Sequence, residues 1–97
     1  MATEVRDNPA QRRYEAYVDG ELAAFSEYGR TGDRVTFIHT RVEPAFEGRG
    51  VGSDLVRGAL DDVRRRGGQV VARCPFVRAW LQRHPEQQDL LAVPLDA

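Results

Sequence analysis

The chain has 97 residues, enough for one domain but not for a second core of ordinary size. Apolar residues make up 41% of it and charged residues 30%, a balance that argues against a wholly disordered chain. Fourteen basic residues, all arginine, face fifteen acidic ones, so a net charge of −1 gives no general attraction to nucleic acid or anionic membranes. The absence of lysine excludes a Walker-type phosphate loop and lysine-based catalysis.

Cysteine content and hydropathy exclude further classes of protein. The one cysteine, Cys74, cannot form an internal disulfide, which excludes a disulfide-stapled secreted mini-protein. No apolar run approaches the roughly 20 residues that span a bilayer, and the first residues lack the apolar segment of a signal peptide. His39, Cys74 and His84 do not have metal-ligand spacing. We therefore expect one cytoplasmic domain over residues 1–97, with no metal, nucleic-acid or membrane partner.

The first half of the chain has the alternation and turn signals of strands. Asp19-Gly20 is a two-residue hairpin signal, because both positions of such a turn need positive φ. In the segment Arg34–Val42, apolar residues occupy both odd and even positions, which predicts a strand buried on both of its faces. The predicted strands are Arg13–Val18, Glu21–Tyr28 and Arg34–Val42, with a turn over Gly29–Asp33.

The spacing of apolar residues along the chain changes after Pro44. Apolar residues then recur on one helical face until Gly67-Gly68, which predicts a helix over Gly50–Arg66. A short apolar strand, Gln69–Cys74, and a second helix, Pro75–His84, follow. The segment 34–74 is long enough for a right-handed crossover between parallel strands. The predicted fold is therefore α/β (α+β in stricter usage), with a mixed, mainly antiparallel sheet of four to five strands and two main helices.

The glycine-rich segment Gly48–Gly52 joins the predicted strand to the predicted helix. The first N–H groups of a helix have no internal partner, and glycines let an anion approach them closely. The spacing does not fit a dinucleotide-binding fingerprint, because Ser53 stands where the third glycine belongs. The segment is typical of a phosphate site, although a flexible turn with tight helix–sheet packing explains the glycines equally well.

The residues around the glycines decide between these interpretations. The pattern Val42-x-Pro44-x-Phe46-x-Gly48-x-Gly50-x-Gly52 resembles motif A of the GNAT acyltransferases. The resemblance implies that acetyl-CoA is the cosubstrate, with its pyrophosphate on main-chain N–H groups and its pantetheine arm between strands 34–42 and 69–74. The cofactor-binding residues it implies are Val42, Gly48, Arg49, Gly50, Val51, Gly52 and Ser53.

Four separated motifs extend the resemblance to a narrower group. They are His39-Thr40-x-Val42, Glu47–Gly52, Cys74-Pro-Phe-Val and Arg83-His-Pro-Glu, and they resemble the small YjdJ-like group of predicted N-acetyltransferases. This implies acetyl transfer to an amine of a small molecule or protein, by a monomer or homodimer. Two departures stand out: Glu47 cannot donate a hydrogen bond to phosphate, and no tyrosine follows Tyr28 to serve as the general acid that many GNATs place in the last helix.

Cys74 and His39 are the candidate catalytic residues. Cys74 is predicted at a strand end and a helix N-terminus, which favours a thiolate, although free cysteines are often simply buried. His39 is a candidate general base on a strand beside the acyl site, or a structural histidine, and we expect it near Cys74. The missing tyrosine keeps a second class open, in which the chain is a non-catalytic acyl-CoA-binding or protein-interaction module.

Overall fold

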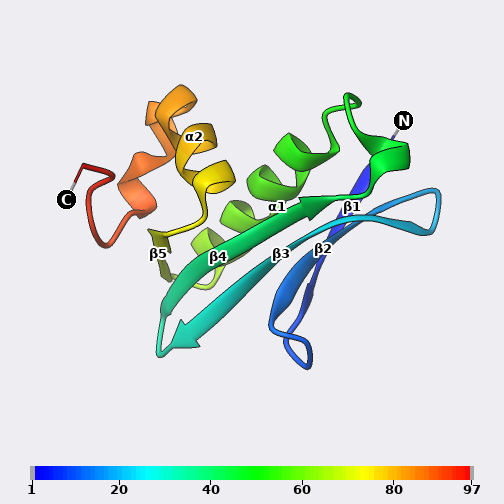
Figure 1. The fold of residues 1–97 in the computed structure, drawn as a ribbon. Coiled ribbons are helices and arrows are strands. Elements are labelled where there is room, and N and C mark those ends of the chain that lie inside the picture. The colour runs from blue at the N-terminus through cyan, green and yellow to red at the C-terminus, as the bar shows by residue number, and fades with distance from the viewer. Residues whose placement is uncertain (1, 97) are drawn as a thin grey trace.

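The computed structural model describes residues 2–96 and places all their strands in one five-stranded sheet of order β1-β2-β3-β4-β5 (Figure 1). The first four strands are antiparallel to their neighbours, and β5 is parallel to β4. The strands are β1 (Thr3–Asn8), β2 (Arg13–Val18), β3 (Glu21–Thr31), β4 (Arg34–Val42) and β5 (Gln69–Ala72). The predicted mixed, mainly antiparallel α+β fold is confirmed.

The hairpins agree with the prediction in part. β2 and β4 have the predicted bounds, and Asp19 and Gly20 adopt the positive φ values, 52° and 80°, that their turn requires. The turn predicted over residues 29–33 is wrong at its start, because β3 continues to Thr31 and only Gly32 and Asp33 form the turn. The strand β1 is not among the strands predicted from the sequence.

A bulge divides β4 into two halves. Tyr28 pairs with Phe37 and Glu27 pairs with His39, which leaves Ile38 without a partner on β3. The extra residue changes the parity of the strand, so that the buried side chain of Phe37 and the half-buried side chain of Thr40 lie on the same face. The prediction that β4 is covered on both faces is therefore wrong, since Ile38 is 54% exposed.

Two α-helices cover one face of the sheet (Figure 1). The helix α1 (Val51–Arg65) contacts all five strands, and α2 (Pro75–Arg83) packs against α1, β4 and β5. Both lie within the predicted ranges, with Gly50 and Arg66 as the caps of α1 and His84 as the C-cap of α2. Short 3-10 helices, η1 (Pro44–Phe46) and η2 (Pro85–Leu90), precede α1 and follow α2.

The core is one cluster between the helices and the inner face of the sheet. Trp80 is fully buried in it, and the indole N–H donates to the Ser53 hydroxyl at 2.8 Å. His84 stacks on the Trp80 ring with centroids 3.8 Å apart. The cluster therefore joins α2 directly to the first turn of α1. Its largest fully buried side chains are Tyr14, Phe37, Leu55, Leu60, Trp80 and Leu81.

The outer face of the sheet carries polar side chains, aromatic rings covered by arginines and the exposed side chain of Ile38. The guanidinium of Arg13 lies 4.5 Å from the centroid of the Phe25 ring. Glu15 is only 5% exposed on this face and accepts hydrogen bonds from Asn8, Arg13 and Tyr17. Burial opposes ionisation of this carboxyl, but these hydrogen bonds outweigh it and lower the pKa of Glu15.

Candidate functional site

An open groove of about 420 Å³ lies where β4, the glycine loop and α2 meet. Six of the seven predicted cofactor-binding residues line it: Val42, Gly48, Gly50, Val51, Gly52 and Ser53. Phe46, Glu47 and Phe76 complete the lining. The seventh, Arg49, belongs to the same loop, and its guanidinium lies 5.6 Å from the centroid of the Phe46 ring.

The loop turns the first amides of α1 toward this groove. Gly50 is the N-cap of the helix with φ 77°, a conformation that other residues rarely adopt. The first intrahelical bond runs from the Asp54 N–H to the Gly50 carbonyl, so the amides of Val51, Gly52 and Ser53 have no carbonyl partner within the helix. No side chain of the described residues caps this end. The groove therefore ends at the positive end of a helix dipole.

Gly52 allows the helix to approach the groove floor. A β-carbon at this position would lie 2.6 Å from the Phe76 Cζ atom and 3.3 Å from the Val42 Cγ2 atom. Phe76 remains 39% exposed, although its ring reaches this close to the helix. Gly52 thus serves tight packing, while the open space around Gly48 and Gly50 is free for a ligand. Both interpretations of the glycines apply, at different positions of the same loop.

The strands β4 and β5 separate beyond the groove. Their pairing ends at Phe37 and Ala72, while β4 continues to Val42. The amides of Arg73 and Cys74 both donate to the Phe37 carbonyl, at 3.0 and 2.9 Å, where the chain turns into α2. The Glu43 N–H donates to Ala23 on β3, so strand alternation turns the Val42 N–H the other way, toward the gap. The strand predicted over 69–74 is therefore wrong at its end, because β5 stops at Ala72, and β4 continues past it toward Val42.

Cys74 lies at the base of this gap. It is the N-cap of α2 and is 2% exposed. The Sγ atom lies 3.2 Å from the Thr40 Oγ1 atom, which in turn lies 2.9 Å from the Ser26 Oγ atom. The thiol thus ends a chain of buried hydroxyl groups that the sequence did not predict.

A family model for GCN5-related N-acetyl-transferases matches residues 13–90, which include the groove, the gap and Cys74. The chain belongs to this GNAT family. A search of curated proteins by sequence found no match. The GNAT assignment makes the chain an acyltransferase, with N-acetyl transfer as its general activity.

Solved structures have the same fold as this GNAT domain. A GCN5-like protein from Staphylococcus aureus superposes with a TM-score of 0.70 and 19% identity, over 94% of this chain and 89% of its own. A ribosomal-protein-alanine N-acetyltransferase from Brucella melitensis gives 0.59 and 19%, over 84% and 62%. Nourseothricin acetyltransferase gives 0.54 and 28%, over 87% and 53%. The chain therefore spans roughly half to two thirds of the two larger enzymes.

The expected approach of His39 to Cys74 is not found in this GNAT domain. The His39 ring lies on the outer face of the sheet, edge-on to Phe25 with centroids 6.4 Å apart. Cys74 lies on the inner side with Thr40. Because β4 runs between the two side chains, His39 can face only a group that arrives over the outer face of the sheet.

The three tyrosine hydroxyls each donate to a carboxylate: Tyr14 to Asp62, Tyr17 to Glu15 and Tyr28 to Asp7. Burial and the hydrogen bond to Asp7 raise the pKa of Tyr28 to about 12. Burial and Asp62 likewise raise the pKa of Tyr14. None of these hydroxyls lines the groove.

Two further features bear on partners. Within residues 2–96, neither helix combines the length and apolar content needed to cross a bilayer. In the same part of the chain, no three His, Cys, Asp or Glu side chains gather as metal ligands would.

Proposed function

We propose that the chain transfers an acetyl group from acetyl-CoA to a primary amine. The observation that carries the proposal is the groove that ends at the uncapped first turn of α1. Three main-chain N–H groups, those of Val51, Gly52 and Ser53, would donate to the pyrophosphate there. Glu47 lines the same groove and brings a negative charge, so the main chain has to supply the phosphate contacts on this side.

The gap between β4 and β5 would hold the pantetheine arm and the thioester. Val42 and Phe76 offer apolar surface along this path, and the Val42 N–H would donate to the thioester carbonyl. That hydrogen bond strengthens as negative charge develops on the carbonyl oxygen during attack by the amine. The amine would arrive over the outer face, where His39 is the candidate to accept its proton.

Gly50→Asp tests the phosphate assignment, because it places a carboxylate where the pyrophosphate would bind. We expect the affinity for acetyl-CoA, measured by calorimetry, to fall about 100-fold or more, as for the loss of charge-assisted hydrogen bonds. Gly20→Asp is the matched control: Gly20 has φ 80° and, like Gly50, open space where a β-carbon would stand, but it lies in a hairpin outside the groove. Equal affinity in the two variants would overturn the assignment.

Cys74→Ala tests the second half of the proposal. The Cys74 thiol lies at the base of the gap, so it is the candidate to protonate the departing CoA thiolate or to carry the acetyl group. We expect turnover to fall about 100-fold, as for loss of a general acid or base, while acetyl-CoA binding is kept. Iodoacetamide labelling of the wild type should be slowed by acetyl-CoA. Unchanged turnover in Cys74→Ala would return the residue to a packing role and leave direct attack by the amine.

A second candidate function is a non-catalytic acyl-CoA-binding module. The engagement of every tyrosine hydroxyl with a carboxylate favours it, because the usual GNAT acid is missing. Acetyl-CoA binding without turnover against a panel of small amines and peptides would support this alternative. The proposal also includes an amine acceptor on a small molecule or a protein, a monomeric or homodimeric state, and a cytoplasmic location.

A further inference from the structure

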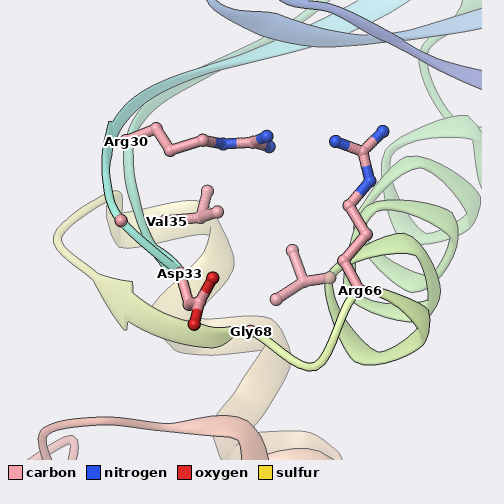
Figure 2. Close-up of a pocket in the computed structure, with 7 residues that line it drawn as sticks. Arg30, Asp33, Val35, Arg66 and Gly68 are labelled. Carbon is pink, nitrogen blue, oxygen red and sulfur yellow. The ribbon is translucent and has the colours of Figure 1, made fainter.

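We propose that a small cavity between Arg30 and Arg66 is a second anion-binding site, suited to a carboxylate or a phosphate group. The cavity has a volume of about 60 Å³ and lies at the opposite end of α1 from the glycine loop. Figure 2 shows the two guanidinium groups pointing toward each other across it, one from β3 and one from the C-cap of α1. Its lining is Arg30, Gly32, Asp33, Val35, Val63, Arg66 and Gly68.

The two guanidinium groups share one carboxylate, that of Asp7, without a close hydrogen bond to it. One buried oxygen, Asp7 Oδ2, lies 3.5 Å from the Arg30 Nη2 atom and 3.4 Å from the Arg66 Nη2 atom. Both distances exceed that of a good hydrogen bond, and this oxygen has no hydrogen-bond partner among the described residues. The other contact of the Arg30 guanidinium is the Tyr28 ring, 5.1 Å away. Most of its five N–H donors therefore remain for a ligand.

The shape of the cavity fits a small oxyanion. Val35 and Val63 are buried and supply apolar walls. A cavity of about 10–15 Å³ on this measure holds one water molecule, so about 60 Å³ leaves room for a group of several atoms such as acetate or phosphate. Two facing guanidinium groups would each donate N–H hydrogen bonds to such an anion, which is the geometry in which arginine binds carboxylates and phosphates most strongly.

The charges around the cavity permit an anion. Arg66 also pairs with Asp62, at 3.1 Å, and Arg65 pairs with the same carboxylate, at 2.6 Å. The network thus joins three guanidinium groups to the two carboxylates of Asp7 and Asp62. The remaining charged group of the lining is the Asp33 carboxylate, which lies below the two guanidinium groups (Figure 2). With it, the carboxylates around the cavity equal the guanidinium groups in number.

Amide NMR spectra of the full chain test the proposal. Sodium phosphate and sodium acetate are titrated at constant ionic strength against sodium chloride. We expect saturable shifts of the Gly32, Asp33 and Gly68 amides, and at least a tenfold loss of affinity in Arg30→Gln. Arg64→Gln is the control, since it removes the same charge close to the same end of α1, but from a side chain paired with Asp89 outside the cavity. Asp33→Asn should bind the anion more tightly.

The outcomes separate this site from the glycine loop. Gly50→Asp should lose any phosphate shifts at residues 48–53 and keep those at Gly32 and Gly68. Saturation by phosphate alone or by acetate alone supports the site and assigns its ligand class. Equal shifts in wild type and Arg30→Gln, with Arg30→Gln folded by the same spectrum, would overturn it. Shifts confined to residues 48–53 would do the same.

Discussion

The first and last turns of α1 carry opposite partial charges, and the chain treats them differently. At the first turn the amides face an open groove, and no side chain among the described residues caps them. At the last turn, Arg64, Arg65 and Arg66 oppose the negative helix end and pair with Asp62, Asp7 and Asp89. Unpaired main-chain N–H groups thus face the groove proposed for acetyl-CoA at the first turn, while arginine side chains oppose the negative helix end and line the second cavity at the last turn.

The difference also shows in what holds each end in place. The first turn depends on apolar packing and two side-chain hydrogen bonds, those of Trp80 to Ser53 and of Thr3 to Asp54. The last turn depends on charged pairs and two tyrosine–aspartate hydrogen bonds, Tyr14 to Asp62 and Tyr28 to Asp7. Substitutions at the two ends should therefore differ in size and in their dependence on pH.

The largest effect should come from Trp80→Ala, which removes the fully buried ring behind the first turn. We expect the free energy of unfolding to fall by about 3–5 kcal/mol, as for other large-to-small changes in a core. Urea denaturation measures this. Ile38→Ala is a suitable control, because Ile38 is more than half exposed and its truncation should change the midpoint little. A midpoint for Trp80→Ala as high as that of the control would contradict the packing described.

Gly52→Ala should have an intermediate effect. The added β-carbon meets the Phe76 ring, and overpacking of this kind costs about 1–3 kcal/mol. The double variant Gly52→Ala with Phe76→Ala tests the cause, since removal of the ring removes the clash. We expect the penalty of the glycine substitution, measured by thermal denaturation, to shrink in the Phe76→Ala background. An undiminished penalty would point to Val42 as the limiting contact instead.

The smallest effect should come from Tyr28→Phe at the other end of the molecule. Loss of its hydrogen bond to Asp7 should cost about 1 kcal/mol at neutral pH. Because the pKa of Tyr28 is raised in the folded state, from 10 to about 12, the contribution is fully present below pH 10 and is lost as the pH rises toward 12. Denaturation of both proteins from pH 8 to 12 should show the difference shrinking, and a constant difference would argue against the assignment.

The helices and the groove could be predicted because each depends on a pattern of residues close together in the sequence. The helices follow from apolar periodicity and their glycine or proline boundaries. The groove follows from one short segment, since six of the seven residues predicted between Val42 and Ser53 line it. The strand β1 escapes prediction because Val5 is its one aliphatic residue, and it is defined by pairing with β2 at the sheet edge. The predicted burial of β4 on both faces is wrong because one bulge places apolar residues on both parities.

Sites assembled from distant segments left no such signal. The second cavity brings together residues of β3, the following turn and the end of α1, and the carboxylate between its arginines comes from β1. The Thr40–Cys74 contact likewise joins residues 34 positions apart. His39 could be assigned to β4 from the sequence, but the face it occupies depends on the bulge one residue earlier.

The bulge at Ile38 also constrains how the chain can change. Regular alternation through all nine residues would turn His39 and Arg41 toward the hydrophobic interior and Thr40 and Val42 outward, so the bulge is needed as long as Ile38 is present. Deletion of Ile38 would remove the extra residue and leave His39 opposite Glu27, with each later side chain on its present face. The strand can therefore lose this residue, but it cannot keep the residue and lose the bulge without exchanging the faces of its second half.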